Sequence, residues 1–382
     1  MNLLVVTNDF PPILGGIENY IYSLVKRWPP SSVAVVTRQA PDAGKFDAQL
    51  DFEVHRRPVN RLLPNRTLTS FLKEIIAKRR VDLVHFPSAL PLGVLGASLG
   101  LPYAVSVHGG EFLLASRLPG VRSVLKKVCL EATVLLAESS FAETLVDALV
   151  GRRAAVERIT CGVEVARFGK EAAVVPDGLR SGSPVIVSVG RLIARKGQRT
   201  LVKAMPAILR RHSRAQLLIV GGGPDLPKLR HLSEELGVSG SVTLTGPQPW
   251  DEIPGYYCAG DVFALPTAPK FLGTETEGLP LVFVEAAATG LPLVGGKAGG
   301  VHDAVRDGKT GYVVDGESVT ETADALLRIL GDPSLATKLG SAARKMAEEE
   351  FDWDHVASAY RQTLESYWTH AKEEAGGFRG FH

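Results

Sequence analysis

The sequence predicts an α/β protein with two doubly wound, Rossmann-like domains, and three observations carry this prediction. Short apolar runs of strand length alternate with amphipathic runs of helix length. This alternation occurs once in each half of the chain, and a turn-rich stretch at 171–183 separates the halves. The 382 residues are enough for two domains that each bury a core. Such βα alternation is typical of a mostly parallel sheet covered by helices on both faces.

The individual elements follow from apolar periodicity. In the first half we expect strands at 3–7, 33–37, 81–86, 103–107 and 134–137, with an amphipathic helix around 68–76. In the second half we expect strands at 185–189, 216–220, 242–245, 262–265 and 293–295, with helices at 201–211, 227–236 and 282–289. The predicted domains are therefore 1–170 and 184–350, joined by a linker at 171–183. Helices at 334–349 and 354–372 close the chain, and 373–382 reads as a loose tail.

Composition excludes several classes of protein. A hydrophobic content of 45% with 22% charged residues is typical of a globular chain, and a net charge of +2 gives no reason to expect a nucleic-acid partner. Cys129, Cys161 and Cys258 are too far apart for a disulfide framework or a zinc site. Residues 86–107 carry no charge, but prolines and glycines divide them into shorter elements of a buried α/β core. The N-terminus lacks the pattern of a secretory signal, so a cytoplasmic location is expected.

The stretch 273–285 has the densest chemistry in the chain. Glu277 is predicted to lie in a turn after a strand, and Glu285 on the helix that follows. The first amides of that helix lack intrahelical partners and carry the positive end of its dipole, which suits a phosphate. Pro280 has no N–H, so Gly278, Leu279 and Leu281 are the available donors. Taken alone, the spacing is better explained by two solvated acids beside an ordinary turn.

Loops after other predicted strands carry further candidates. Gly15-Gly16 begins a helix after the first strand, and His108 follows the strand at 103–107. Arg191 and Lys196 lie in a glycine-flanked loop after the strand at 185–189 and suit a diphosphate, whereas Arg195 reads as a solvated residue. Gly221-Gly-Gly allows a ligand close to the backbone, although a tight turn explains it as well.

Three of these segments resemble one known family. The segments are T-N-D-F-P-P-I-L-G-G-I at 7–17, G-R-L-I-A-R-K-G at 190–197 and E-G-L-P-L-V-F-V-E-A at 277–286. Together they are similar to the retaining family 4 glycosyltransferases of GT-B fold, and most of all to the GDP-mannose-dependent phosphatidylinositol mannosyltransferases. The resemblance implies two domains that face one another across a cleft, with the last helix returning to the first domain.

The resemblance also implies roles for single residues. Arg191 and Lys196 would stabilise the leaving diphosphate, Glu277 would hold sugar hydroxyls, and His108 would contact the sugar; these four are the predicted catalytic residues. Glu285 would hold the ribose. The remaining predicted donor contacts are Gly15, Gly16, Gly222, Pro247, Gln248, Gly278, Leu279 and Leu281. The predicted acceptor-side residues are Asp9, Tyr20 and Glu111.

Two departures limit what the resemblance implies. Pro247 stands where the family often has a basic residue, which leaves the base open. His302 and Asp303 replace a proline and a glutamate of the family's turn at 298–303, and neither is given a role. The sequence shows no pattern of metal ligands, so neither a metal nor another cofactor is expected.

The acceptor is expected to be a lipid or a glycan. Residues 112–128 mix apolar side chains with Arg117, Arg122, Lys126 and Lys127, and the same domain contains Arg56, Arg57, Arg61 and Arg66. Such a surface suits peripheral contact with an anionic membrane, and a solvated helix face is the alternative.

Several other functions share most of these motifs. A UDP-sugar-dependent glucosyl- or N-acetylglucosaminyltransferase acting on a soluble or cell-envelope acceptor is the main alternative. A sucrose- or trehalose-type synthase would differ only on the acceptor side. A GT-B sugar-nucleotide epimerase and a non-catalytic sugar-nucleotide-binding protein are further alternatives; the family form of the Glu277–Glu285 motif argues against the first, and Arg191 with Lys196 argues against the second.

Overall fold

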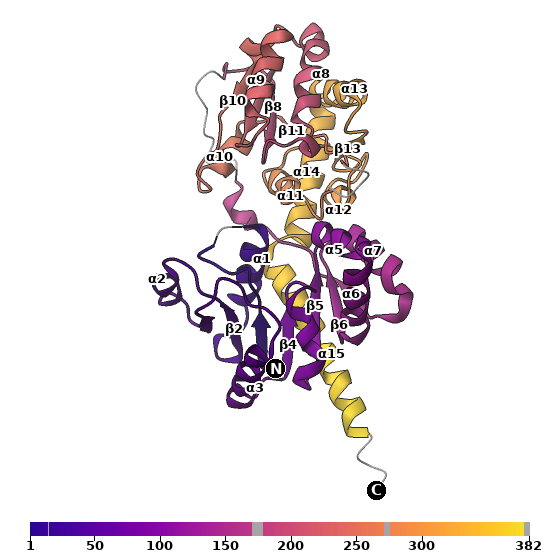
Figure 1. Cartoon of the computed structure of the whole chain (residues 1–382). Coiled ribbons are helices and arrows are strands. Elements are labelled where there is room, and N and C mark those ends of the chain that lie inside the picture. Colours follow the sequence, from indigo (N-terminus) through magenta and orange to yellow (C-terminus); the bar gives the residue numbers. More distant parts are fainter. Residues whose placement is uncertain (14, 170–178, 271–275, 378–382) are drawn as a thin grey trace. The chain divides into compact units, whose positions relative to one another are not determined.

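The computed structural model describes residues 1–13, 15–169, 179–270 and 276–377 (Figure 1). The chain divides into two compact units. Unit 1 contains Met1–Cys161 and Trp353–His382, and unit 2 contains Gly162–Asp352. This division differs from the predicted boundaries, because residues 162–169 belong to unit 2. Most of the predicted linker at 171–183 lies outside the described residues, because the structure describes none of 170–178.

Unit 1 is built on a seven-stranded parallel sheet in the order β3-β2-β1-β4-β5-β6-β7. Its strands are β1 (Leu3–Val6), β2 (Val33–Arg38), β3 (Glu53–Arg57), β4 (Leu83–Phe86), β5 (Tyr103–Val107), β6 (Val134–Ala137) and β7 (Val156–Arg158). The order reverses between β1 and β4, as in other doubly wound sheets. The carboxyl ends of β1, β4, β5 and β6 therefore lie side by side, and the loops that follow them share one edge of the sheet.

Helices cover this sheet, and the final helix belongs to the same unit. The helices are α1 (Gly16–Val25), α2 (Ala43–Asp47), α3 (Arg66–Arg79), α4 (Gly96–Leu99), α5 (Gly109–Arg117), α6 (Pro119–Glu131), α7 (Ser140–Val150) and α15 (Trp353–Gly377). Helix α15 packs against α1. Its buried Tyr360 hydroxyl forms a hydrogen bond with Nδ1 of His85 on β4 at 2.7 Å. A helix that is distant in sequence is thereby fixed to the centre of the sheet.

Unit 2 repeats the design with a six-stranded parallel sheet in the order β10-β9-β8-β11-β12-β13. Its strands are β8 (Val185–Val189), β9 (Gln216–Val220), β10 (Val242–Leu244), β11 (Val262–Leu265), β12 (Leu293–Gly296) and β13 (Gly311–Val314). Its helices are α8 (Gln198–Arg211), α9 (Leu226–Glu235), α10 (Ile253–Cys258), α11 (Leu281–Ala288), α12 (Val301–Ala304), α13 (Val319–Leu330) and α14 (Pro333–Glu350). Strands β8, β9 and β11 are buried along their whole length, which explains why they read as continuous apolar runs.

The predicted α/β class with two Rossmann-like sheets is confirmed, and the structure adds three strands that the sequence did not reveal. These are β3, β7 and β13, each at the edge of a sheet. The predicted loose tail does not begin at 373, because α15 continues to Gly377; residues 378–382 lie outside the described residues.

Candidate active site

Three loops at the carboxyl edge of the unit 2 sheet are bound to one another through their backbones. The Leu192 amide donates to the Gly222 carbonyl at 2.9 Å, and the Gly221 amide donates to the Gly246 carbonyl at 3.0 Å. Gly221 has a φ of 140°, and a Cβ there would lie 2.1 Å from the Gly190 carbonyl oxygen. Only glycine fits such a contact. The loops after β8, β9 and β10 therefore form one rigid edge.

Glu277 lies at this edge in the turn before α11, as predicted, and its carboxylate faces two cations. Oε2 accepts a hydrogen bond from Lys196 Nζ at 2.9 Å. Oε1 lies 3.0 Å from Arg195 Nε, but the two atoms are not aligned for a hydrogen bond, and neither has another partner among the described residues. The Glu277 side chain is only 7% exposed. Arg195, expected to be a solvated residue, instead faces this carboxylate.

The backbone of Glu277 is held by the turn at 298–303. The Gly300 amide donates to the Glu277 carbonyl at 3.1 Å. Gly299 has a φ of 52°, and a Cβ there would lie 1.8 Å from the same carbonyl oxygen. The two glycines of this turn therefore fix Glu277 through the main chain.

Glu285 lies inside α11 and is 4% exposed. Its Oε2 accepts a hydrogen bond from the buried Tyr257 hydroxyl at 2.6 Å. Burial raises the pKa of Glu285, and the Tyr257 hydrogen bond with the charges of Arg167 and Lys196 acts in the opposite direction. In the described part of the chain, the amides of Gly278, Leu279 and Leu281 have no hydrogen-bond acceptor, so this end of α11 retains free donors.

The predicted diphosphate loop presents a cation, Arg191, whose side chain forms no hydrogen bond or ion pair in the described part of the chain. Arg191 is exposed, and its carbonyl oxygen accepts from Gln198 Nε2 at 3.4 Å, which ties the loop to the start of α8. In the loop after β10, Pro247 is exposed, whereas the Gln248 side chain donates to the Thr245 carbonyl at 3.0 Å.

In unit 1, His108 lies between β5 and α5, as predicted, and both of its ring nitrogens have partners. Nδ1 lies 2.8 Å from Glu138 Oε2, and Nε2 lies 2.9 Å from the Pro87 carbonyl oxygen. Burial lowers the pKa of His108, but Glu138, Glu111 and the Pro87 carbonyl together outweigh burial and raise the pKa above its ordinary value. Sequence reasoning missed Glu138, although an acidic residue directly after a parallel strand was a usable signal.

The other predicted residues of unit 1 differ in accessibility. Tyr20 is 2% exposed, and its ring meets His108 edge-on at 5.5 Å, so it supports His108 from inside the unit. Asp9 and Glu111 line a small cavity at the carboxyl edge of the sheet. Gly15 and Gly16 are exposed at the start of α1, and Gly15 has an extended backbone with a φ of 179°. The turn at Gly15 therefore does not require the left-handed conformation.

The predicted basic surface is only partly present. The Arg56 side chain is 6% exposed and forms two hydrogen bonds to Asp47, at 2.7 and 2.8 Å, so Arg56 belongs to the interior. Arg57 stacks on the Phe71 ring. Arg61 and Arg66 are exposed, as are Arg117, Arg122 and Lys127 along α5 and α6, while Lys126 is half-buried.

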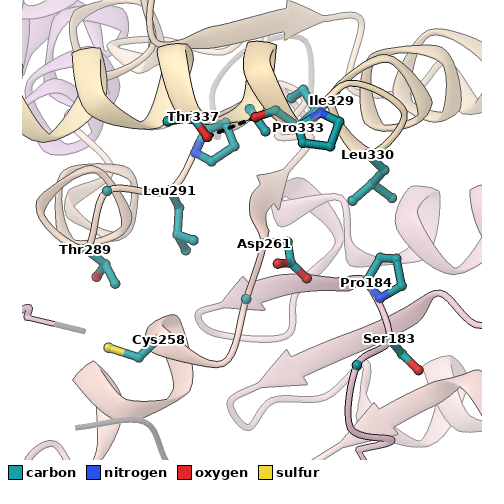
Figure 2. A pocket seen from close by; sticks show the side chains of 15 residues that line it. Ser183, Pro184, Cys258, Asp261, Thr289, Leu291, Ile329, Leu330, Pro333 and Thr337 are labelled. Atoms are coloured by element: carbon teal, nitrogen blue, oxygen red, sulfur yellow. Dashed lines mark hydrogen bonds between the residues drawn. The ribbon is translucent and has the colours of Figure 1, made fainter. Parts of the chain in front are cut away.

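A cavity of about 470 Å³ in unit 2 lies away from these motifs (Figure 2). It is lined by Pro184, Asp261 and Pro292, which directly precede β8, β11 and β12. These residues mark the amino-terminal edge of the sheet. Ligands of open α/β sheets bind at the opposite, carboxyl edge, so this cavity is not the candidate active site.

The described residues were compared with what a metal site and a membrane span require. These residues contain no group of three or more His, Cys, Asp or Glu side chains that could hold a metal ion. They also contain no helix that is both long and apolar enough to cross a bilayer.

The sequence is similar to known protein families and to individual proteins of known activity. Residues 14–167 match the family model of Glycosyltransferase Family 4, and residues 170–346 match that of Glycosyl transferases group 1. A GDP-mannose-dependent alpha-(1-6)-phosphatidylinositol monomannoside mannosyltransferase of Mycobacterium tuberculosis is 38% identical, over 93% of this chain and 96% of its own. A GDP-mannose-dependent monoacylated alpha-(1-6)-phosphatidylinositol monomannoside mannosyltransferase of Corynebacterium glutamicum is 35% identical, over 95% and 97%.

Solved structures share the architecture at low sequence identity. The Anabaena protein HepE, solved with UDP, superposes with a TM-score of 0.79 at 19% identity, over 96% of this chain and all of its own. Sucrose-phosphate synthase of Thermosynechococcus elongatus gives a TM-score of 0.75 at 23% identity, over 97% of this chain and all of its own. At this level of identity the likeness concerns the fold alone.

The two parallel Rossmann-like sheets give the chain the GT-B fold, which its solved structural neighbours share. The chain belongs to the Glycosyltransferase Family 4 and group 1 glycosyltransferases, as the family models and the extent of identity to their members show.

Proposed function

We propose that the chain transfers mannose from GDP-mannose to a phosphatidylinositol-type glycolipid, with retention at the anomeric carbon and without a metal ion. The names of its relatives support the donor and the acceptor class. One observation in the structure carries the site. Glu277 keeps a buried oxygen without a hydrogen bond, beside Lys196 and the free amides of α11. A sugar hydroxyl is a suitable donor for that oxygen, and a diphosphate suits the cations.

In the proposed reaction, the diphosphate leaves while its charge is stabilised. Arg191, Lys196 and the amides of Gly278, Leu279 and Leu281 would bind the diphosphate oxygens, and such electrostatic stabilisation commonly dominates catalysis. The bond between the anomeric carbon and the diphosphate breaks, and an acceptor oxygen bonds to that carbon on the same face. The acceptor hydroxyl loses its proton to the departing diphosphate. Glu285 would hold the ribose, and His108 would contact the sugar.

The lipid acceptor is proposed to be reached at a surface of unit 1 formed by α5 and α6. We call it the α5–α6 surface, and it consists of the exposed residues Leu114, Arg117, Leu118, Val121, Arg122, Val124 and Lys127. Leu114 and Leu118 are 56% and 49% exposed, which is unusual for large apolar side chains unless a further surface covers them. Apolar side chains next to cations suit an anionic bilayer, and the proposed location is therefore cytoplasmic and peripheral to the membrane.

A donor screen tests this proposal. Purified protein is incubated in EDTA with GDP-mannose, UDP-glucose or UDP-N-acetylglucosamine, and thermal stabilisation and slow donor hydrolysis are measured. We expect GDP-mannose to raise the unfolding temperature and to be hydrolysed, because a ligand that binds only the folded state stabilises it. Preference for a UDP-sugar would overturn the mannosyl assignment, and activity that requires an added divalent ion would overturn metal independence.

A further inference from the structure

We propose that Glu138 is a positioning residue for sugar transfer: it orients the His108 ring and keeps both ring nitrogens protonated, so that the donor sugar meets an imidazolium. This inference deepens the proposed function and rests on it. It concerns a residue that no motif singled out, directly after the strand β6, which carries none of the predicted site residues.

The hydrogen bonds around His108 determine its protonation. Both partners of its ring nitrogens are acceptors: the Glu138 carboxylate faces Nδ1 at 2.8 Å, and the Pro87 carbonyl faces Nε2 at 2.9 Å. A neutral imidazole has a single N–H and could serve only one of them. The other oxygen of the same carboxylate, Glu138 Oε1, accepts a hydrogen bond from the Gly109 amide at 2.9 Å. The ring is therefore an imidazolium that donates from both nitrogens.

The fold places the two residues together for a simple reason. His108 follows β5, and Glu138 follows β6, and these strands are parallel neighbours in the sheet. Their side chains are 9% and 11% exposed, so water competes little with the contact. Because Glu138 binds both the His108 ring and the Gly109 amide, one carboxylate fixes the ring and the first residue of α5.

The groups packed around His108 do not supply another proton acceptor for Nδ1. Tyr20 of α1 meets the ring edge-on, and burial raises the pKa of its hydroxyl, so it stays neutral. Burial lowers the pKa of His85 on β4 to about 3, so His85 is also neutral. Cys161 is buried, and its pKa is raised. Glu111 of α5 adds negative charge, but the group bonded to Nδ1 among the described residues is Glu138.

The function of the contact follows from the charge of the ring. The Pro87 carbonyl binds the Nε2 proton in the structure described here. Without Glu138, the ring would be neutral, and the Pro87 carbonyl would keep the single proton on Nε2, so the positive charge facing the donor sugar would be lost. A carboxylate behind a histidine fixes the ring in this way in many sites, and its loss costs roughly tenfold to a hundredfold in function.

The test compares Glu138→Gln with Glu157→Gln, a change on β7 that removes only the exposed partner of the Tyr367 hydroxyl. The ring nitrogens of His108 are titrated by nitrogen NMR, and the His108→Asn spectrum assigns its signals. We expect Glu138→Gln to lower the pH at which His108 loses its proton. We expect the His108 titration of Glu157→Gln to match that of the wild type. The catalytic constant for hydrolysis of the preferred donor should fall tenfold or more at pH 8, with recovery as the pH is lowered.

Two results would overturn the inference. One is a His108 titration in Glu138→Gln that matches the wild type. The other is a titration that shifts while the catalytic constant and its pH profile stay as in the wild type, because a merely structural contact would behave in that way. Failure of the proposed function gives a different result, because the wild type then prefers a UDP-sugar to GDP-mannose. In that case the two variants are compared with the UDP-sugar as donor. Absence of turnover by the wild type with any sugar nucleotide would overturn both the proposed function and the inference about Glu138.

Discussion

Glu277 illustrates how single residues of this chain are prepared for a ligand. Its carboxylate is nearly buried, one oxygen is bound by Lys196, and the other faces Arg195 without a hydrogen bond. A buried polar atom left without a hydrogen bond costs about 1–3 kcal/mol, and such a cost is usually retained for a functional reason. In our account, the sugar of the donor supplies the missing hydrogen bond.

Arg191 gives the sharpest prediction at the residue scale. Its side chain is exposed and has no partner in the described part of the chain, so Arg191→Ala should leave the unfolding temperature unchanged. Loss of one charge that stabilises the leaving diphosphate should lower the catalytic constant by about 10²–10³-fold. Steady-state kinetics with the preferred donor measure this effect. The control is Arg199→Ala, an exposed arginine in the first turn of α8, which should retain activity; equal losses in both variants would contradict the assignment of Arg191.

Residues also show where the sequence was informative and where it was not. The motif predicted that Glu277 lies in a turn, that Glu285 lies on a helix and that a helix begins after Pro280, because turn and helix signals are local. It did not predict that Arg195 faces Glu277, that Tyr20 and Arg56 are buried, or that Glu138 contacts His108. Those facts depend on contacts between segments distant in sequence.

Edge strands limited the prediction of elements. The strand β3 is half-buried along its length and contains Glu53, His55, Arg56 and Arg57, so it lacks the apolar run that marks a central strand. The strand β7 is three residues long, and two of them are exposed. By contrast, the inner strands β1, β4, β5, β8, β9 and β11 are buried throughout and were predicted from composition.

The α5–α6 surface gives the prediction at the element scale. Replacing Leu114 and Leu118 together by serine should weaken binding to vesicles that contain phosphatidylinositol by about thirtyfold. Each side chain is half-exposed in the protein and would contribute about 1 kcal/mol on entering the bilayer. Co-sedimentation with vesicles measures the effect, and the unfolding temperature should not change. Leu236→Ser, an exposed leucine of unit 2, is the control. Equal binding by the double variant and the wild type would show that the α5–α6 surface does not bind the membrane.

At the scale of the whole molecule, the repeated βα alternation was sufficient to predict the fold class, because every turn of a doubly wound sheet uses the same strand–helix pattern. The boundary between the units was harder to predict. Residues 162–169 belong to unit 2, and Val163 forms a parallel bridge with Asp352, 189 positions later in the chain. A link of that kind leaves no mark in local periodicity.

The central claim is that this glycosyltransferase moves mannose to a phosphatidylinositol-type lipid, and transfer itself tests it most directly. Radiolabelled GDP-mannose is incubated with the protein and with vesicles that contain phosphatidylinositol monomannoside, and the lipid product is isolated and its anomeric configuration determined. We expect label in a lipid with one more mannose, in the α configuration of the donor, and only background label with Arg191→Ala. Label confined to water-soluble products, or transfer from UDP-glucose but not from GDP-mannose, would contradict the account.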